Sequence, residues 1–341
     1  MKQEHGGPWQ EFRAEVQNGT TKRLAVVLGS GMHKMWEPET PEEADAVSTL
    51  GSWSGLLHGI GLKTPYELRD PTMLWEAALL EMSLEKDPSA EDRNRMLRRK
   101  VSKAVADAEE VLAHRLSTPQ EPGGGGPLRA VRSVLESPAV TDVVSLNVDR
   151  TVERLLSEDG SVIHEVGDHD NPLARYATVD RPRPGASPVR VWYPHGFREE
   201  PDSLSFGLRR YSRLVEGFEA ERREVKRRER EWREGRNEGT ETPTAGADGG
   251  RIPESWLEVL MFQPVLFAGV SLDPAEWDVW TALVLRWRNY ARDDNRTYEP
   301  SAWVLSNGNS HAHLPQQRFT FLDAGGWDRS WSVLAKCLEA G

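Results

Sequence analysis

Short apolar runs alternate with longer amphipathic stretches along most of the chain. Residues 23–28 (RLAVVL) are apolar and include β-branched side chains, a pattern typical of a buried strand. Similar runs predict strands at 142–146, 162–166, 189–193, 264–268, 302–305 and 318–322. Apolar positions at helical spacing predict helices at 72–85, 91–116, 149–156, 208–233, 275–290 and 327–340. This alternation predicts an α/β protein with a Rossmann-like, mainly parallel sheet and helices on both faces.

Three segments depart from the alternation. Residues 42–135 are mostly helical and predict a helical insertion, which either covers an active site or forms an oligomer interface. Residues 168–187 are rich in Pro, Asp and Arg and predict a loop. Residues 235–250 are polar and predict a flexible linker or loop. The chain shows no internal repeat, and its 341 residues are enough for one large domain or two ordinary ones.

Composition narrows the class of protein. The formal net charge is −11, so the chain gains no general attraction to a phosphate backbone, and nucleic acid is not an expected partner. The charged residues 222–236 pair Glu with Arg at helical spacing, which is typical of a solvated helix; a contact with nucleic acid or a partner protein is the alternative. The single cysteine, Cys337, excludes an intramolecular disulfide. Because no secretory signal and no run of ~18 apolar residues is found, we expect a cytoplasmic protein without membrane contact.

The first predicted strand runs into a glycine turn, Gly29-Ser30-Gly31. Such a turn lets the backbone approach a pyrophosphate, whose charge is met by amide groups and by the start of the next helix. The third glycine of the dinucleotide fingerprint is absent at the expected spacing. An ordinary tight turn between strand and helix fits these residues equally well.

Two further strand ends carry polar side chains. Asn147 follows the strand at 142–146, where open α/β sheets bind ligands, and its amide can hold a ribose hydroxyl or a water. A turn asparagine is the alternative, and the nearby Asp149 suits the cap of the following helix. His195 follows the strand at 189–193, and a neutral imidazole there can act as a general base, although a structural histidine is the commoner case.

A fourth strand end has the same form. Gly269 and Ser271 follow the strand at 264–268, where they can face the adenosine half of a dinucleotide. Asp273 and Pro274 are a good N-cap and first-turn pair for the next helix. His311 and His313 lack a third ligand at suitable spacing, so no metal site is expected.

In the order of these motifs the chain resembles the sirtuin-like family, in the divergent form found in bacterial NAD-consuming antiphage defence proteins. The resemblance rests on Gly29-Ser30-Gly31 for the first glycine motif, Asn147 and Asp149 for the Asn-x-Asp motif, His195-Gly196 for the catalytic His-Gly pair, and Gly269 and Ser271 with Asp273 for the late Gly-x-Ser motif. Tyr211 loosely matches a tyrosine often found in the divergent group. Together the motifs span about residues 23–305.

The resemblance implies a single sirtuin-like domain, 1–341, that binds NAD and breaks the bond between nicotinamide and ribose. Asn147 would position the ribose or the attacking water, His195 would be the general base, and Asp149 would support the ribose pocket. Gly29, Ser30 and Gly31 would approach the phosphates. We therefore expect an NAD glycohydrolase that releases nicotinamide and ADP-ribose, with NAD as its substrate.

Departures from the family pattern limit this hypothesis. One cysteine cannot build the four-cysteine zinc module of protein deacylases, so no zinc is expected and deacylation is disfavoured. Ser30 replaces the usual alanine, and His33 stands near the usual serine or threonine. A module that senses NAD or ADP-ribose without turnover is the alternative. By family analogy we expect an antiphage effector that acts as a homo-oligomer or with a separate ATPase or short Argonaute.

Overall fold

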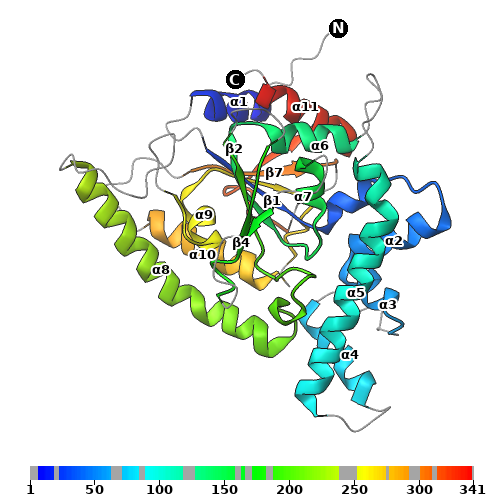
Figure 1. Ribbon diagram of the computed structural model, residues 1–341. Coiled ribbons are helices and arrows are strands. Elements are labelled where there is room, and N and C mark those ends of the chain that lie inside the picture. The colour runs from blue at the N-terminus through cyan, green and yellow to red at the C-terminus, as the bar shows by residue number, and fades with distance from the viewer. Residues whose placement is uncertain are drawn as a thin grey trace.

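An eight-stranded sheet forms the centre of the protein, in the order β3-β4-β5-β2-β1-β6-β7-β8 (Figure 1). The structure is a computed structural model that describes residues 7–18, 23–62, 71–83, 89–117, 127–157, 163–165, 171–181, 187–237, 252–273, 276–291, 300–308 and 313–339. The strands are β1 (Leu24–Leu28), β2 (Val140–Ser145), β3 (Ile163–Glu165), β4 (Tyr176–Val179), β5 (Val189–Trp192), β6 (Val265–Ala268), β7 (Ala302–Ser306) and β8 (Thr320–Asp323). Neighbours from β5 to β8 pair in parallel, whereas β3, β4 and β5 form antiparallel pairs.

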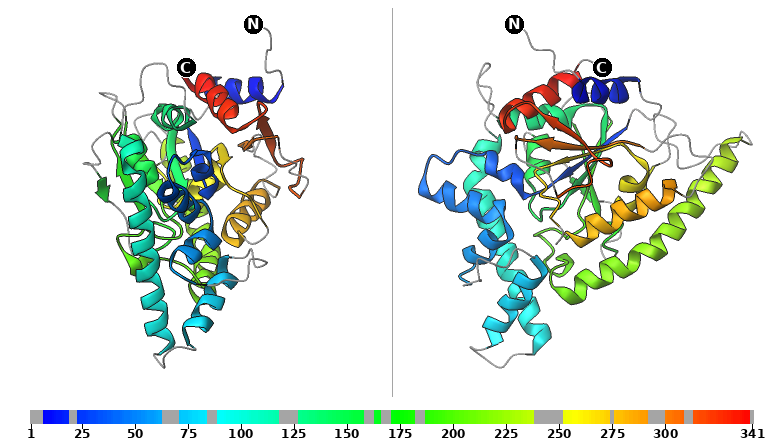
Figure 2. Two further views of the ribbon diagram at one scale, coloured as in Figure 1. Left: turned by 90° about the vertical axis from the view of Figure 1, so that its right-hand side faces the viewer. Right: turned by 180° about the vertical axis from the view of Figure 1, so that it is seen from behind.

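Helices cover both faces of the sheet, which confirms the predicted fold class (Figure 2). They are α1 (Pro8–Asn18), α2 (Pro41–Gly51), α3 (Trp53–Gly59), α4 (Pro71–Ser83), α5 (Ala90–Ser117), α6 (Pro127–Glu136), α7 (Thr151–Leu156), α8 (Leu208–Asn237), α9 (Trp256–Phe262), α10 (Trp277–Ala291) and α11 (Trp327–Glu339). The short 3-10 helices are η1 (Ser30–Met35) and η2 (Pro201–Ser203). In the part of the chain that the structure describes, no helix is long and apolar enough to cross a membrane.

The central strand β1 shows why the sheet is buried on both sides. Side chains of a strand point alternately to opposite faces. Val26 joins the apolar cluster that contains α1, α6 and α11, and Val27 joins the cluster that contains α8, α9 and α10. Every residue of β1 is buried, so a strand at this position needs apolar side chains along its whole length.

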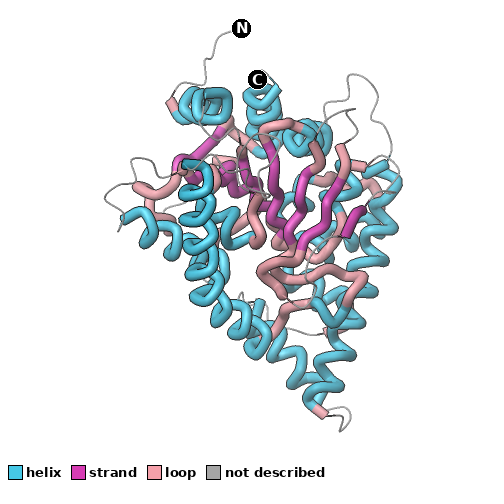
Figure 3. Tube along the Cα trace, turned by 60° about the vertical axis from the view of Figure 1, so that its left-hand side comes forward, coloured by secondary structure: helices cyan, strands magenta, loops and turns pink. Residues whose placement is uncertain are grey.

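The segment α2–α5 extends beyond the sheet as a helical lobe (Figures 1 and 3). Thr40 and Ser52 cap α2 and α3, each accepting a hydrogen bond from a backbone N–H of the first turn. The lobe is anchored through Glu109 of α5, whose buried carboxylate lies 2.8 Å from Arg198 Nε and 3.2 Å from an Arg154 guanidinium nitrogen. Two arginines at the carboxyl edge of the sheet therefore fix the lobe against it.

The structure corrects two predictions made from the sequence. The segment 168–187 was predicted to be a loop, but 176–179 form strand β4, which pairs antiparallel with β5. The available backbone edge of β5 stabilises this strand despite its Pro-rich flanks. Residues 235–237 were predicted to belong to a linker but end α8. The remainder of that predicted linker, 238–250, lies outside the described residues.

Candidate active site

A cavity of about 650 Å³ opens at the carboxyl ends of β1, β2, β5 and β6. The structure brings all the site residues predicted from the sequence to its wall: Gly29, Ser30, Gly31, Asn147, Asp149, His195, Gly269 and Ser271. Four strand ends meet here because parallel strands present their carboxyl ends at one edge of a sheet. The volume lies within the range of roughly 300–1,000 Å³ that is usual for small-molecule sites.

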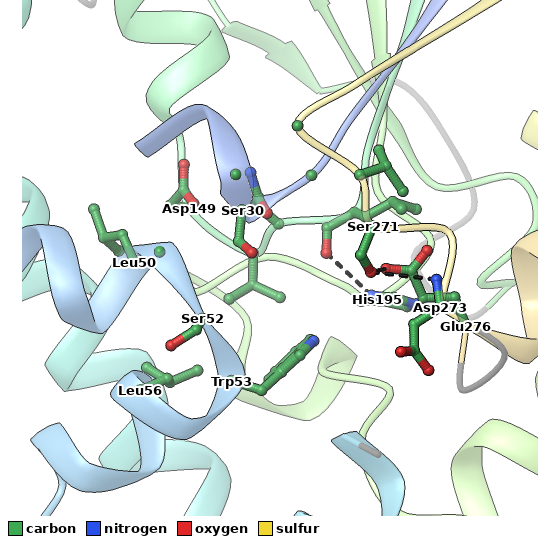
Figure 4. Close-up of a pocket in the computed structure, with 18 of the residues that line it drawn as sticks. Ser30, Leu50, Ser52, Trp53, Leu56, Asp149, His195, Ser271, Asp273 and Glu276 are labelled. Atoms are coloured by element: carbon green, nitrogen blue, oxygen red, sulfur yellow. Dashed lines mark hydrogen bonds between the residues drawn. The ribbon is translucent and has the colours of Figure 1, made fainter. Parts of the chain in front are cut away.

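The helical lobe supplies the opposite wall of this cavity. Figure 4 shows Leu50, Ser52, Trp53 and Leu56 facing the group formed by His195, Ser271, Asp273 and Glu276. The Trp53 ring lies 6.2 Å from the His195 ring, centroid to centroid. Described residues of the lobe therefore line this cavity, while both roles expected for residues 42–135, covering an active site or forming an oligomer interface, stay predictions.

The glycine turn is locked to the loop after β6. A Cβ on Gly29 would lie 2.5 Å from the Gly269 carbonyl oxygen, and one on Gly31 would lie 2.7 Å from it. Gly269 itself has a φ of 65°, a conformation that favours glycine. The Gly31 N–H donates to the Gly269 oxygen over 2.9 Å. These glycines therefore allow two backbones to touch at the cavity wall, while their approach to phosphates stays a prediction.

Asp149 stabilises the turn between β2 and α7. Its carboxylate accepts from the Thr151 N–H at 2.9 Å and lies 3.4 Å from His33 Nε2. Burial acts to raise the pKa of Asp149, but the charge and hydrogen bond of His33 and the hydrogen bonds of Thr151 outweigh it, so the pKa is lowered. Asp149 thus stabilises the turn before α7, whose N-cap is Arg150 rather than Asp149, and fixes η1 through His33; a contact with ribose stays a prediction.

Asn147 offers an unused hydrogen-bond donor at the cavity wall. Its side chain is only 8% exposed, and its Nδ2 is buried with no hydrogen-bond partner among the described residues. Leaving a buried amide unpaired costs about 1–3 kcal/mol. A ligand that fills the cavity and accepts a hydrogen bond from Asn147 would remove that cost.

His195 is held at both ring nitrogens. Nδ1 lies 3.1 Å from the Leu146 carbonyl oxygen, and Nε2 lies 2.8 Å from Asp278 Oδ2. The second oxygen of Asp278 accepts from the Tyr211 hydroxyl, which in turn accepts from the Asp278 N–H at 3.0 Å. The resulting chain, Tyr211–Asp278–His195, joins α8, α10 and the end of β5.

The charges of this chain follow from its hydrogen bonds. A carbonyl oxygen only accepts, so Nδ1 carries a hydrogen, and an ionised Asp278 requires one on Nε2 as well. Burial acts to lower the pKa of His195, but the charge and hydrogen bond of Asp278 raise it above 6.5. Burial acts to raise the pKa of Asp278, but His195 and Tyr211 lower it below 3.8. The two hydrogen bonds and the nearby carboxylate therefore favour the imidazolium form of His195.

Replacing Asp278 with Asn is expected to lower the His195 pKa, because the substitution removes the groups that raise it. The His195 contribution to stability is present below 6.5 and is lost as the pH rises through its raised folded pKa. The Asp278 contribution is present above 3.8 and is lost as the pH falls through its lowered pKa. The Asn variant should therefore be less stable than the wild type mainly between the lowered pKa of Asp278 and the raised pKa of His195. If NMR finds the same imidazole titration of His195 in the variant and the wild type, the pairing of His195 with Asp278 is contradicted.

Several residues of this cavity were not predicted from the sequence. Asp278 and Glu276 lie at the start of α10, where acidic side chains are ordinary complements to the helix dipole and give no separate signal. Lys34 lies on η1 with its side-chain stem beside Gly51 of α2. Tyr211 was noted only for its likeness to a family tyrosine, and the structure shows that it contacts Asp278.

The comparisons with known proteins do not identify a family. No protein-family model matches the chain, and no curated protein matches it. Among the described residues, no group of three or more His, Cys, Asp or Glu side chains is arranged to hold a metal ion. The functional conclusion therefore rests on the cavity and its residues.

Proposed function

We propose that the chain is an NAD glycohydrolase that releases nicotinamide and ADP-ribose. The observation that carries the proposal is the cavity at the carboxyl end of the sheet, whose wall includes Asn147 with its unpaired Nδ2, His195 and a glycine turn. In open α/β sheets, nucleotides bind at this edge. The resemblance to sirtuin-like motifs supports NAD as the nucleotide.

The distribution of charge around the cavity also fits NAD. Lys34 lies beside the glycine turn, where its ammonium group can attract the pyrophosphate. Asp273 and Glu276 lie on the side of His195 (Figure 4), and Asp278 is hydrogen-bonded to His195. Because Asp278 is paired with His195, it is the ionised carboxylates of Asp273 and Glu276 that would favour the positive charge of the nicotinamide ring and of the oxocarbenium-like ribose that forms as the ring leaves. We infer that NAD lies with its nicotinamide ribose towards His195.

The proposed reaction exchanges one bond at the ribose C1′ atom. The bond between C1′ and the nicotinamide nitrogen breaks, and its electron pair leaves with nicotinamide. The oxygen of a water forms the new bond to C1′, and one proton is released. Asn147 is suited to hold the ribose or this water, so its contribution is positioning.

A sensor that binds NAD or ADP-ribose without turnover is the second candidate. The observation that favours it is the state of His195, because an imidazolium that donates from both nitrogens has no lone pair with which to accept a proton. A binding module needs the cavity and Asn147 but no proton acceptor. Turnover is therefore the property that separates the two candidates.

Nicotinamide release from NAD tests the proposal. The purified chain is assayed alone and with the products of neighbouring genes, and NAD binding is measured in parallel by calorimetry. Release of nicotinamide with equal amounts of ADP-ribose would support the glycohydrolase. Binding without release under every condition would support the sensor, and absence of binding would overturn NAD as the ligand.

The biological role follows only from the resemblance. We propose that the enzyme is an antiphage effector that stays inactive until a trigger assembles it, because uncontrolled loss of NAD is toxic. A homo-oligomer, or a separate ATPase or short Argonaute, would supply the assembly. Mass photometry of the chain with NAD and with each candidate partner tests this role.

A further inference from the structure

Glu276 is a second ionisable group of the cavity with a free oxygen. It lies between the loop after β6 and the first residue of α10. Its Oε1 accepts from the Ser271 hydroxyl at 2.8 Å. Its Oε2 is buried and has no hydrogen-bond partner among the described residues. One oxygen is thus held in place by Ser271, while the other is an unpaired, buried acceptor of a residue that lines the cavity.

The hydrogen bonds of His195 leave neither ring nitrogen free to accept a proton. Both ring nitrogens donate, one to the Leu146 carbonyl and one to Asp278, so accepting a proton would require breaking one of these contacts. The free Oε2 of Glu276 requires no such break. Figure 4 shows Glu276 and His195 on the same side of the cavity, opposite Trp53.

We propose that Glu276 is the general base of the reaction and takes the proton of the attacking water through Oε2. This inference rests on the proposed NAD hydrolysis. As C1′ loses nicotinamide with the bonding electron pair, the water oxygen bonds to C1′ and one water proton passes to the Glu276 carboxylate. The resulting carboxyl group then releases that proton to solvent, so the step balances. His195 and Asp278 act as positioning residues.

The charges that face Glu276 suit this role. The pKa of Glu276 is raised to about 7, chiefly by burial and also by the charges of Asp278 and Asp273, which outweigh the lowering by the Ser271 hydrogen bond and the charge of His195. A general base works best when its pKa lies near the operating pH. Because the base must be ionised, kcat/KM should rise with pH through about 7.

Azide rescue tests this role directly. Azide is an anionic nucleophile, so it attacks C1′ without a proton acceptor. At pH 8, Glu276→Ala and Glu276→Gln should lower nicotinamide release by about 100-fold or more. Azide should restore release in Glu276→Ala and yield ADP-ribosyl azide, whereas Asn147→Ala should not be rescued. Glu219→Gln, a surface change on α8, is the matched control and should behave as the wild type.

Four outcomes decide the question. Loss of release with azide rescue, together with loss of the rise in kcat/KM near pH 7 in Glu276→Gln, supports Glu276 as the base. A Glu276→Gln protein with wild-type rate and pH profile overturns this role but leaves NAD hydrolysis intact. A pH rise that disappears in His195→Gln instead also overturns it. A wild type that releases no nicotinamide under any condition overturns both proposals.

A measurement of stability separates a misfolded variant from a catalytic one. The raised pKa of Glu276 means that burying its charge destabilises the fold as the pH rises through about 7. Glu276→Gln should therefore melt at a higher temperature than the wild type at pH 8 and at a similar temperature at pH 5. A lower melting temperature at both pH values would show a structural role and overturn the proposal.

Discussion

Replacing Asn147 with Ala is expected to lower nicotinamide release by about 100- to 1,000-fold, with little change in the free energy of unfolding. The substitution removes a buried amide whose Nδ2 has no described partner, so the native fold loses no hydrogen bond from that atom. The reaction, in contrast, loses the group proposed to position the ribose or water. Steady-state assays and urea denaturation of the same samples measure the two effects.

Asn289 provides the matched control for Asn147. It lies on α10, is 4% exposed, and also has an Nδ2 without a described partner, but it is not part of the cavity wall. Asn289→Ala should therefore leave nicotinamide release unchanged. Equal losses of activity in the two variants would indicate a general effect of removing a buried amide and would contradict the role of Asn147.

Replacing Arg286 with Met is expected to lower the free energy of unfolding by about 4 kcal/mol, the largest effect on stability that we predict. The Arg286 side chain is fully buried in the middle of α10. Its guanidinium group donates to backbone carbonyls at the end of α9 and just before β7, those of Leu260, Gln263, Pro300 and Ser301. Methionine fills part of the space but leaves these acceptors unsatisfied.

Arg288→Met is the control for Arg286→Met, because it removes a positive charge from α10 without removing the hydrogen bonds to the four carbonyls. Arg288 is exposed two residues further along the same helix, so Arg288→Met should change stability by less than about 0.5 kcal/mol. Chemical denaturation of both variants measures the difference. A stable Arg286→Met protein would show that the four carbonyls find other donors.

The sequence predicts which residues line the cavity, because it predicts the strands and the residues that follow them. Gly29, Asn147, His195 and Gly269 each follow an apolar run, and parallel strands bring such positions to one edge of the sheet. This reasoning needs no side-chain geometry. It predicts which residues share the cavity but not which of them contact each other.

The remaining features of the site depend on tertiary packing. Trp53 reaches the cavity only because the helical lobe is anchored to the sheet, and its sequence context is that of any helical tryptophan. Asp278 and Glu276 differ in partners, one ion-paired with His195 and one bonded to Ser271, although both lie at the start of the same helix. Strand β4 likewise depends on the backbone edge that β5 offers.

A crystal structure of His195→Ala with NAD would test the central claim most directly. We predict electron density for NAD in the cavity between the sheet edge and the helical lobe, with the nicotinamide ribose within hydrogen-bond distance of the Asn147 amide. The pyrophosphate should lie beside Lys34 and the glycine turn. Density for NAD at another surface, or a cavity that remains free of ligand at saturating NAD, would contradict the account.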